Sequence, residues 1–124
     1  MSGTIPTSGT DSLTGSNGAD AIDLLAGNDS YLGNGGNDSI LGGDGLDTIY
    51  GGNGDDTILG GNDSDRIYAE AGNDSIDAGA GTGDSVRYNQ GGNQAITATI
   101  SAVGGNTGYN DARVTTASQG NDTI

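Results

Sequence analysis

Apolar side chains recur every nine residues along the first two thirds of the chain. Each lies two residues after an aspartate and follows a run of glycine, asparagine and aspartate. The period matches neither the alternation of an ordinary strand nor the turn of a helix, so it indicates a repeated structural unit. The apolar positions in this phase are Leu13, Ile22, Tyr31, Ile40, Ile49, Ile58, Ile67 and Ile76.

Each nonapeptide divides into a turn and a short strand. In the clearest unit, residues 51–59, the first six residues are glycine, asparagine and aspartate, which favour a turn. The last three, Thr57 to Leu59, predict a very short strand with one inward side chain. The glycine density excludes a helix. We therefore expect an all-β coil of parallel strands, a β-roll (solenoid), with two repeats in each revolution.

This coil stacks alternate aspartates on the same edge. Neighbouring strands lie about 4.8 Å apart, so like charges stand directly above each other, which destabilises the stack. One edge is predicted to carry Asp11, Asp29, Asp47 and Asp65, and the other Asp20, Asp38, Asp56 and Asp74.

The composition offers no side chain that could neutralise these ladders. The chain has 17 acidic residues against three basic ones, a net charge of −14, and no His or Cys. Nucleic acid is excluded as a partner because there is no basic patch, and no stretch approaches the roughly 18 apolar residues of a membrane span. Zinc and copper prefer nitrogen or sulfur ligands. Carboxylates beside the carbonyls of glycine-rich turns instead suit calcium, which takes about six to eight oxygens, better than magnesium.

Residues 9–77 resemble the RTX (repeats-in-toxin) family, whose nonapeptide is G-G-x-G-x-D-x-U-x with U apolar. The best matching units are GGNGDDTIL at 51–59, GNGGNDSIL at 33–41, GGDGLDTIY at 42–50 and GGNDSDRIY at 60–68. The resemblance implies a right-handed parallel β-roll that is secreted without an N-terminal signal and folds outside the cell on binding several Ca²⁺ ions. Residues 1–10 accordingly contain neither the basic nor the apolar region of a signal peptide.

The resemblance also implies a ligand set, in which each ion lies between two turns on one edge. One turn supplies the carbonyls of motif positions two and four with its Asp, and the next turn those of positions one and three with its own Asp. Transferred to this sequence, the first site comprises Asn34, Gly36, Asp38, Gly51, Asn53 and Asp56. The second comprises Gly43, Gly45, Asp47, Gly60, Asn62 and Asp65. The third comprises Gly52, Gly54, Asp56, Ala69, Ala71 and Asp74. The fourth comprises Leu25, Gly27, Asp29, Gly42, Asp44 and Asp47. Two further sites pair Asp20 with Asp38 and Asp11 with Asp29.

Alternative interpretations remain open at this stage. The aspartates could form Asx-turns without an ion, or the chain could stay disordered in calcium-free buffer. Adjacent carboxylates such as Asp55 and Asp56 could act in glycoside hydrolysis, but ligation explains them better, and we expect no enzyme activity. Outward Tyr50 and Tyr68, with Arg66 nearby, either steady the sheet or form a patch for a polysaccharide, a surface or another domain of the parent protein.

The nonapeptide ends before the C-terminus. We expect a flexible lead over 1–8, a calcium-binding β-roll over 9–86, a capping β segment over 87–119 and the start of a truncated repeat at 120–124. The phase slips by one residue before Asp84 and Val86, which form a weak ninth copy. Alternating apolar residues from Ile96 to Ala102 predict one strand that covers the end of the roll. We expect the chain to be a fragment of a larger secreted protein.

Overall fold

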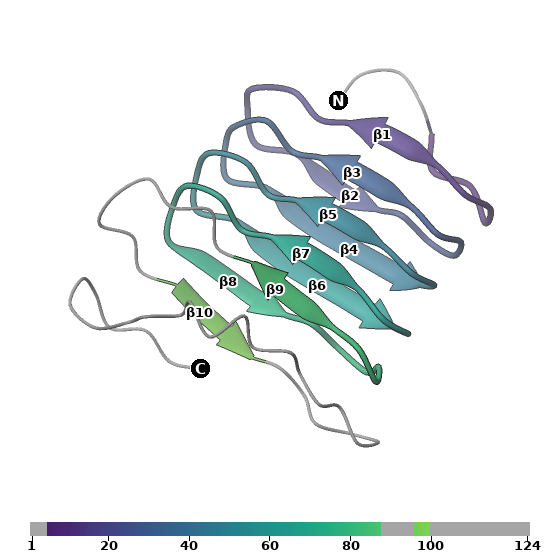
Figure 1. Cartoon of the computed structure of the whole chain (residues 1–124). Helices are drawn as coiled ribbons and strands as arrows, with labels where there is room; N and C mark the ends of the chain where they lie inside the picture. Colours follow the sequence, from purple (N-terminus) through teal and green to yellow (C-terminus); the bar gives the residue numbers. More distant parts are fainter. Residues whose placement is uncertain (1–4, 88–95, 100–124) are drawn as a thin grey trace.

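The computed structural model describes residues 5–87 and 96–99. These residues form an all-β solenoid of about four turns, and they contain no helix. Two five-stranded parallel sheets face each other (Figure 1). The first sheet contains β1 (Ser12–Thr14), β3 (Ser30–Leu32), β5 (Thr48–Tyr50), β7 (Arg66–Tyr68) and β9 (Ser85–Arg87). The second contains β2 (Ala21–Asp23), β4 (Ser39–Asp44), β6 (Thr57–Asn62), β8 (Asp74–Asp77) and β10 (Ile96–Thr99).

Alternate strands stack upon each other, which confirms the predicted coil of two nonapeptides per revolution. Ile49 of β5 lies opposite Ile67 of β7 in the first sheet, and Ile40 of β4 opposite Ile58 of β6 in the second. The registered partners are thus two nonapeptides apart. Because this register brings identical motif positions together, whatever one repeat places in its turn is repeated directly above and below.

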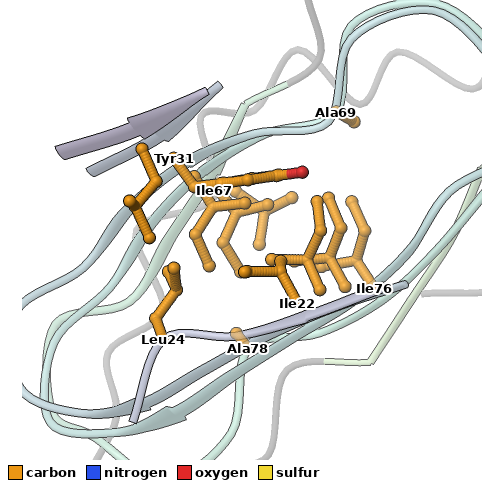
Figure 2. Packing of buried hydrophobic residues seen from close by; sticks show 12 residues of the cluster. Ile22, Leu24, Tyr31, Ile67, Ala69, Ile76 and Ala78 are labelled. Atoms are coloured by element: carbon orange, nitrogen blue, oxygen red, sulfur yellow. The ribbon is translucent and has the colours of Figure 1, made fainter. Parts of the chain in front are cut away.

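The core is one cluster of side chains that reach inward from both sheets (Figure 2). Strand side chains alternate between faces, so the central residue of each short strand points inward and its neighbours point outward. Leu24, Ala69 and Ala78 also belong to this cluster, although they occupy the first position of the motif, where the central repeats have glycine. The full set is Leu13, Ile22, Leu24, Tyr31, Ile40, Ile49, Ile58, Ile67, Ala69, Ile76, Ala78 and Val86.

Two strands of the second sheet run further than the sequence predicts. A three-residue strand was expected at 57–59, but β6 continues through a glycine pair to Asn62, and β4 likewise continues to Asp44. In the turn before β6, Gly54 has a φ of 127°, and a Cβ added there would lie 2.1 Å from the carbonyl oxygen of Gly36. Glycine is therefore required at position 54, because the stacked turns leave no space for a side chain there.

A ninth copy of the repeat completes the first sheet. Val86 of β9 pairs with Ile67 of β7 and is buried, and Asp84 is buried beside it. The extra residue in this repeat is absorbed in the turn, so the strand phase is retained. At the end of the second sheet, β10 pairs with β8, which confirms a strand beginning at Ile96. The expected residues 100–102 of that strand and the segment 113–116 lie outside the described residues.

The outward side chains of the first sheet stack on one another. The rings of Tyr50 and Tyr68 are 4.4 Å apart between centroids and nearly parallel, with 6° between their planes. Leu32 lies opposite Tyr50 on the neighbouring strand, and the guanidinium carbon of Arg87 lies 5.8 Å from the Tyr68 ring centroid. Both rings therefore have neighbours along the stack, an arrangement that stabilises adjacent strands.

A second ladder of hydrogen bonds runs along the outside of the turns, at motif position five. The Asp55 N–H donates to Asn37 Oδ1 at 3.0 Å, and the Asn73 N–H donates to Asp55 Oδ1 at 2.9 Å. On the opposite edge the Leu46 N–H donates to Asn28 Oδ1 at 3.0 Å. Leu46 itself has no acceptor in its side chain and is 54% exposed, so the ladder on this edge ends there.

Replacing Leu46 by asparagine should extend this outer ladder, because the new side-chain oxygen can accept the N–H of Ser64 one revolution later. One additional hydrogen bond is expected to raise the free energy of unfolding by about 0.5–1.5 kcal/mol. Urea denaturation in saturating calcium would measure it. Leu46→Ala is the matched control, since it removes the same exposed apolar side chain without supplying an acceptor. Equal midpoints for the two variants would contradict the ladder explanation.

Candidate metal centre

Besides Asp84, six aspartates lie almost completely buried where the turns meet the sheets. Each has an exposed fraction of at most 2%. Each occupies motif position six, at the junction between the turn and the strand of its repeat. Its side chain therefore points between the stacked turns. The set is Asp29, Asp38, Asp47, Asp56, Asp65 and Asp74.

One carboxylate oxygen of each of these aspartates accepts a hydrogen bond from the preceding revolution. The Asp38 N–H donates to Asp56 Oδ1 at 2.9 Å, and the Asp56 N–H donates to Asp74 Oδ1 at 3.0 Å. On the other edge the Asp47 N–H donates to Asp65 Oδ1 at 3.0 Å. The structure thereby confirms both predicted ladders, and it connects their members directly through backbone amides.

The second oxygen of each carboxylate has no such partner. The Oδ2 atoms of all six aspartates are buried and make no hydrogen bond within the described residues. A buried polar atom without a partner costs free energy, and an ionised carboxylate costs considerably more than a neutral group. A regular series of such atoms indicates that a cationic partner belongs beside them.

In four of the six repeats, glycine at motif position one provides the space around these oxygens. A Cβ added at Gly51 would lie 2.6 Å from Asp56 Oδ2, and one at Gly42 would lie 2.7 Å from Asp47 Oδ2. The same holds for Gly33 and Gly60. A side chain at these positions would collide with the carboxylate, so the glycines preserve its orientation.

The turn carbonyls assigned to the sites also hold successive turns in register. At motif position two, the Asn34 carbonyl accepts the Asn53 N–H at 2.9 Å. At position three, the Ala71 carbonyl accepts the Gly54 N–H at 2.7 Å. A carbonyl oxygen has two lone pairs, so each can accept this bond and still face a cation. The same pattern involves the predicted carbonyls of Leu25, Asp44, Gly52 and Asn62.

The turn conformation persists where the motif glycines are missing. Motif position two has positive φ at Leu25 (77°), Asn34 (71°) and Glu70 (62°), and motif position four at Asp63 (73°). These are conformations that side-chain-bearing residues rarely adopt. The stacked neighbours therefore impose the turn, and departures from glycine strain it without changing its path.

Burial changes the acidity of the ladders. Desolvation raises the pKa of Asp56 to about 6, although the hydrogen bond from Asp38 lowers it. The same cause raises the pKa of Asp65 and of Asp74 to about 7, against the backbone hydrogen bonds from Asp47 and Asp56 respectively. Neighbouring carboxylates add to each rise. Burial raises the pKa of Asp29, Asp38 and Asp47 in the same direction.

Beside the ladders, Asp84 confirms the weak ninth copy, whereas the Tyr31 hydroxyl was not predicted to be part of a site. Asp84 accepts the Asp65 N–H on Oδ1 at 3.0 Å and so extends one ladder, although its repeat is one residue longer. The buried Tyr31 hydroxyl has no hydrogen-bond partner in the described part of the chain. Burial is the main cause that raises the pKa of Tyr31 to about 12, and the carboxylates of Asp20, Asp38 and Asp56 add to the rise. The apolar pattern identified only its ring.

Asp20 differs from the six buried aspartates. Its Oδ2 accepts the Ser16 N–H at 2.6 Å, and this hydrogen bond is the main reason that its pKa is lowered. Across residues 5–87 and 96–99, no three His, Cys, Asp or Glu side chains converge as a metal cluster. A site of two carboxylates completed by carbonyls has too few acidic side chains to form such a cluster.

The residues present nevertheless fit a hard divalent cation, because the donor atoms are all oxygens and the buried Oδ2 atoms need a positive partner. The family model for the RTX calcium-binding nonapeptide repeat, which contains four copies, matches residues 7–31, 32–67 and 50–83. No curated protein and no solved structure matches the chain. The matched segments together cover residues 7–83, more than half of the 124 residues. The chain therefore belongs to the RTX calcium-binding nonapeptide repeat family.

Proposed function

We propose that this chain is a module whose folding is driven by several Ca²⁺ ions held between its stacked turns. The observation that carries the proposal is the series of six buried Oδ2 atoms without a partner in the described residues. A bound cation would neutralise these carboxylates and satisfy their second oxygens. Since the binding sites do not exist in the unfolded chain, the binding free energy would contribute to folding.

The best supported sites lie in the central repeats, where glycine stands at position one and, except at Asp63, also at position four. Asp38 and Asp56 would share one ion with the carbonyls of Asn34, Gly36, Gly51 and Asn53. Asp47 and Asp65 would share another with the carbonyls of Gly43, Gly45, Gly60 and Asn62. The sites that continue each edge would use Asp29 with Asp47 and Asp56 with Asp74. An interior aspartate such as Asp56 would then contact two ions.

The biological role that follows is structural. The family is typical of secreted proteins, and calcium sites of extracellular modules bind with dissociation constants of about 10⁻⁴–10⁻³ M. Such sites would be empty inside a cell and occupied outside it. We therefore propose a non-enzymatic, extracellular repeat module of a larger secreted protein, exported without an N-terminal signal. In the described part of the chain, no helix has the length and apolar content that crossing a membrane requires.

Polysaccharide binding receives no specific support from the outer face of the first sheet. A sugar ring packs against an open aromatic face, but Tyr50 and Tyr68 stack on each other. Leu32 and Arg87 lie beside their outer sides. The stack therefore supports a stabilising role for these side chains over a binding platform.

A calcium titration followed by circular dichroism tests the proposal. In calcium-free buffer the chain should give the spectrum of an unfolded polypeptide, because its carboxylates are uncompensated. Millimolar calcium should produce a β-sheet signal that EGTA reverses. Magnesium at the same concentration should produce little, since it needs a tighter octahedral site. A signal that did not respond to calcium, or that responded equally to magnesium, would falsify the proposed function.

A further inference from the structure

The two turns of the first coil contain hydrogen bonds from motif position two to Oδ2 of the motif aspartate, and the turns from residue 24 to residue 77 lack them. Ser16, at motif position two, donates its N–H to Asp20 Oδ2 at 2.6 Å. Its Oγ lies 3.1 Å from both that Oδ2 and the carbonyl oxygen of Gly18, either of which can accept the hydroxyl proton. The Gly18 N–H in turn donates to Ser16 Oγ at 3.1 Å. One hydroxyl thus connects the carboxylate with motif position four.

The other turn of this coil repeats the arrangement with threonine. Thr7 donates its N–H to Asp11 Oδ2 at 2.6 Å and its hydroxyl to the same oxygen at 2.9 Å. Thr7 Oγ1 also lies 3.5 Å from the Gly9 carbonyl oxygen and accepts the Gly9 N–H at 3.2 Å. Two different residue types at equivalent positions make the same contacts, so the arrangement is a property of the coil.

The backbone of these turns differs accordingly. From residue 24 to residue 77, motif positions two and four have positive φ in every repeat. Thr7, Gly9, Ser16 and Gly18 are outside that region. A β-branched residue such as threonine rarely adopts positive φ. At ordinary φ, the amide of position two meets the Oδ2 of its own aspartate, whereas in the repeats from residue 24 to residue 77 that oxygen lacks a hydrogen bond within the described residues.

We infer that the first coil is a calcium-independent end cap, in which the Thr7 and Ser16 hydroxyls and amides take the place of ions. They engage Asp11 Oδ2, Asp20 Oδ2 and the position-four carbonyls, which are the atoms an ion would need there. The series of ions then begins one revolution later, at Asp29 and Asp38, and Asp20 is not a calcium ligand. This inference rests on the proposed function, because it specifies where the calcium ladder ends.

A cap of this kind suits the end of a solenoid. A terminal repeat has a neighbour on one side only, and solenoids use atypical terminal repeats for this reason. The hydrogen bonds between Ser16 and Asp20, and between Thr7 and Asp11, join residues four apart in sequence. They satisfy the terminal carboxylates locally, without requiring a further turn or an ion.

Counting the calcium ions bound to the full chain by native mass spectrometry tests the inference. The double variant Asp11→Asn with Asp20→Asn should bind as many ions as the wild type, because neither carboxylate holds one. Asp38→Asn should bind fewer. Loss of ions from the double variant would overturn the cap. If the wild type bound no calcium, the proposed function would fail, which is a different result.

A gain of sites gives the complementary test. Thr7→Gly with Ser16→Gly introduces the residue found at position two of the central repeats, so it should add one ion on each edge. The matched control is Thr10→Gly with Ala19→Gly, which introduces the same two glycines at motif position five and should leave the ion count unchanged. An unchanged count in the position-two variant would overturn the inference. Should that variant fail to fold, the ion count of the asparagine variant decides alone.

Discussion

Replacing Asp56 by alanine should increase the calcium concentration needed for half-maximal folding more than any change on the exposed surface. The substitution removes a carboxylate that the proposed sites on both sides would share. It also removes the acceptor of the Asp38 N–H, which is bound at 2.9 Å in a buried position. Leaving a buried donor without a partner costs about 1–3 kcal/mol. We therefore expect a shift of at least tenfold in the calcium midpoint, measured by circular dichroism.

Asparagine at the same position separates the two causes. Asp56→Asn retains an oxygen that can accept the Asp38 N–H, but it loses the negative charge. Its calcium midpoint should therefore rise less than that of Asp56→Ala and remain above that of the wild type. Asp55→Asn is the matched control, because Asp55 is exposed and the change in net charge is identical. The shared-ligand explanation fails if Asp55→Asn and Asp56→Ala shift the midpoint equally.

The nine-residue period was sufficient to predict the architecture. Because one apolar residue follows each aspartate at a constant offset, only one phase of the coil buries every apolar position. The observed pairing of Ile40 with Ile58 and of Ile49 with Ile67 is that phase. The two aspartate edges follow from it directly. The repeat therefore determined both the register and which carboxylates are neighbours.

The departures from this prediction arise where stacking overrides the motif. Leu25 and Glu70 adopt the positive φ of the glycines they replace, because the turns on either side impose it. Asp84 joins a ladder although its spacing is wrong, since a turn can absorb one extra residue while the strand keeps its partner. Neither effect is visible in a single repeat, because both depend on the neighbouring revolution.

The end of the ladder was predictable only in part. Thr7 and Ser16 were not singled out from the sequence, although both occupy position two, where the motif has glycine. Their hydrogen bonds to Asp11 and Asp20 depend on the ordinary φ that these residues adopt. The motif alone does not specify the conformation of that turn. In this conformation, the residue that replaces glycine forms a pair of hydrogen bonds to the aspartate.

In calcium-free buffer, lowering the pH should partly restore the folding that calcium otherwise drives. In the folded chain the pKa of Asp56 is raised to about 6, and those of Asp65 and Asp74 to about 7, from the ordinary value of 3.8. The folded state therefore binds protons more tightly than the unfolded state. The resulting stability is fully present below pH 3.8 and is lost as the pH rises through about 6 to 7. In calcium-free buffer, the β-sheet signal should accordingly increase as the pH is lowered from 8 to 5.

Calcium and protons should then compete for the same carboxylates. The calcium midpoint is expected to rise as the pH falls below about 7, and calcium binding near that pH should release protons. Titration calorimetry in buffers of different ionisation enthalpy would measure the release.

The double variant Asp65→Asn with Asp74→Asn removes the two groups with the highest pKa values in the ladders, so its proton release near pH 7 should be smaller. It retains the exposed carboxylates, whose protonation also lowers the net negative charge, and thereby separates the buried ladder from the general charge effect. A calcium-free signal that stays constant between pH 8 and 5 would show that burial of these carboxylates does not control the fold.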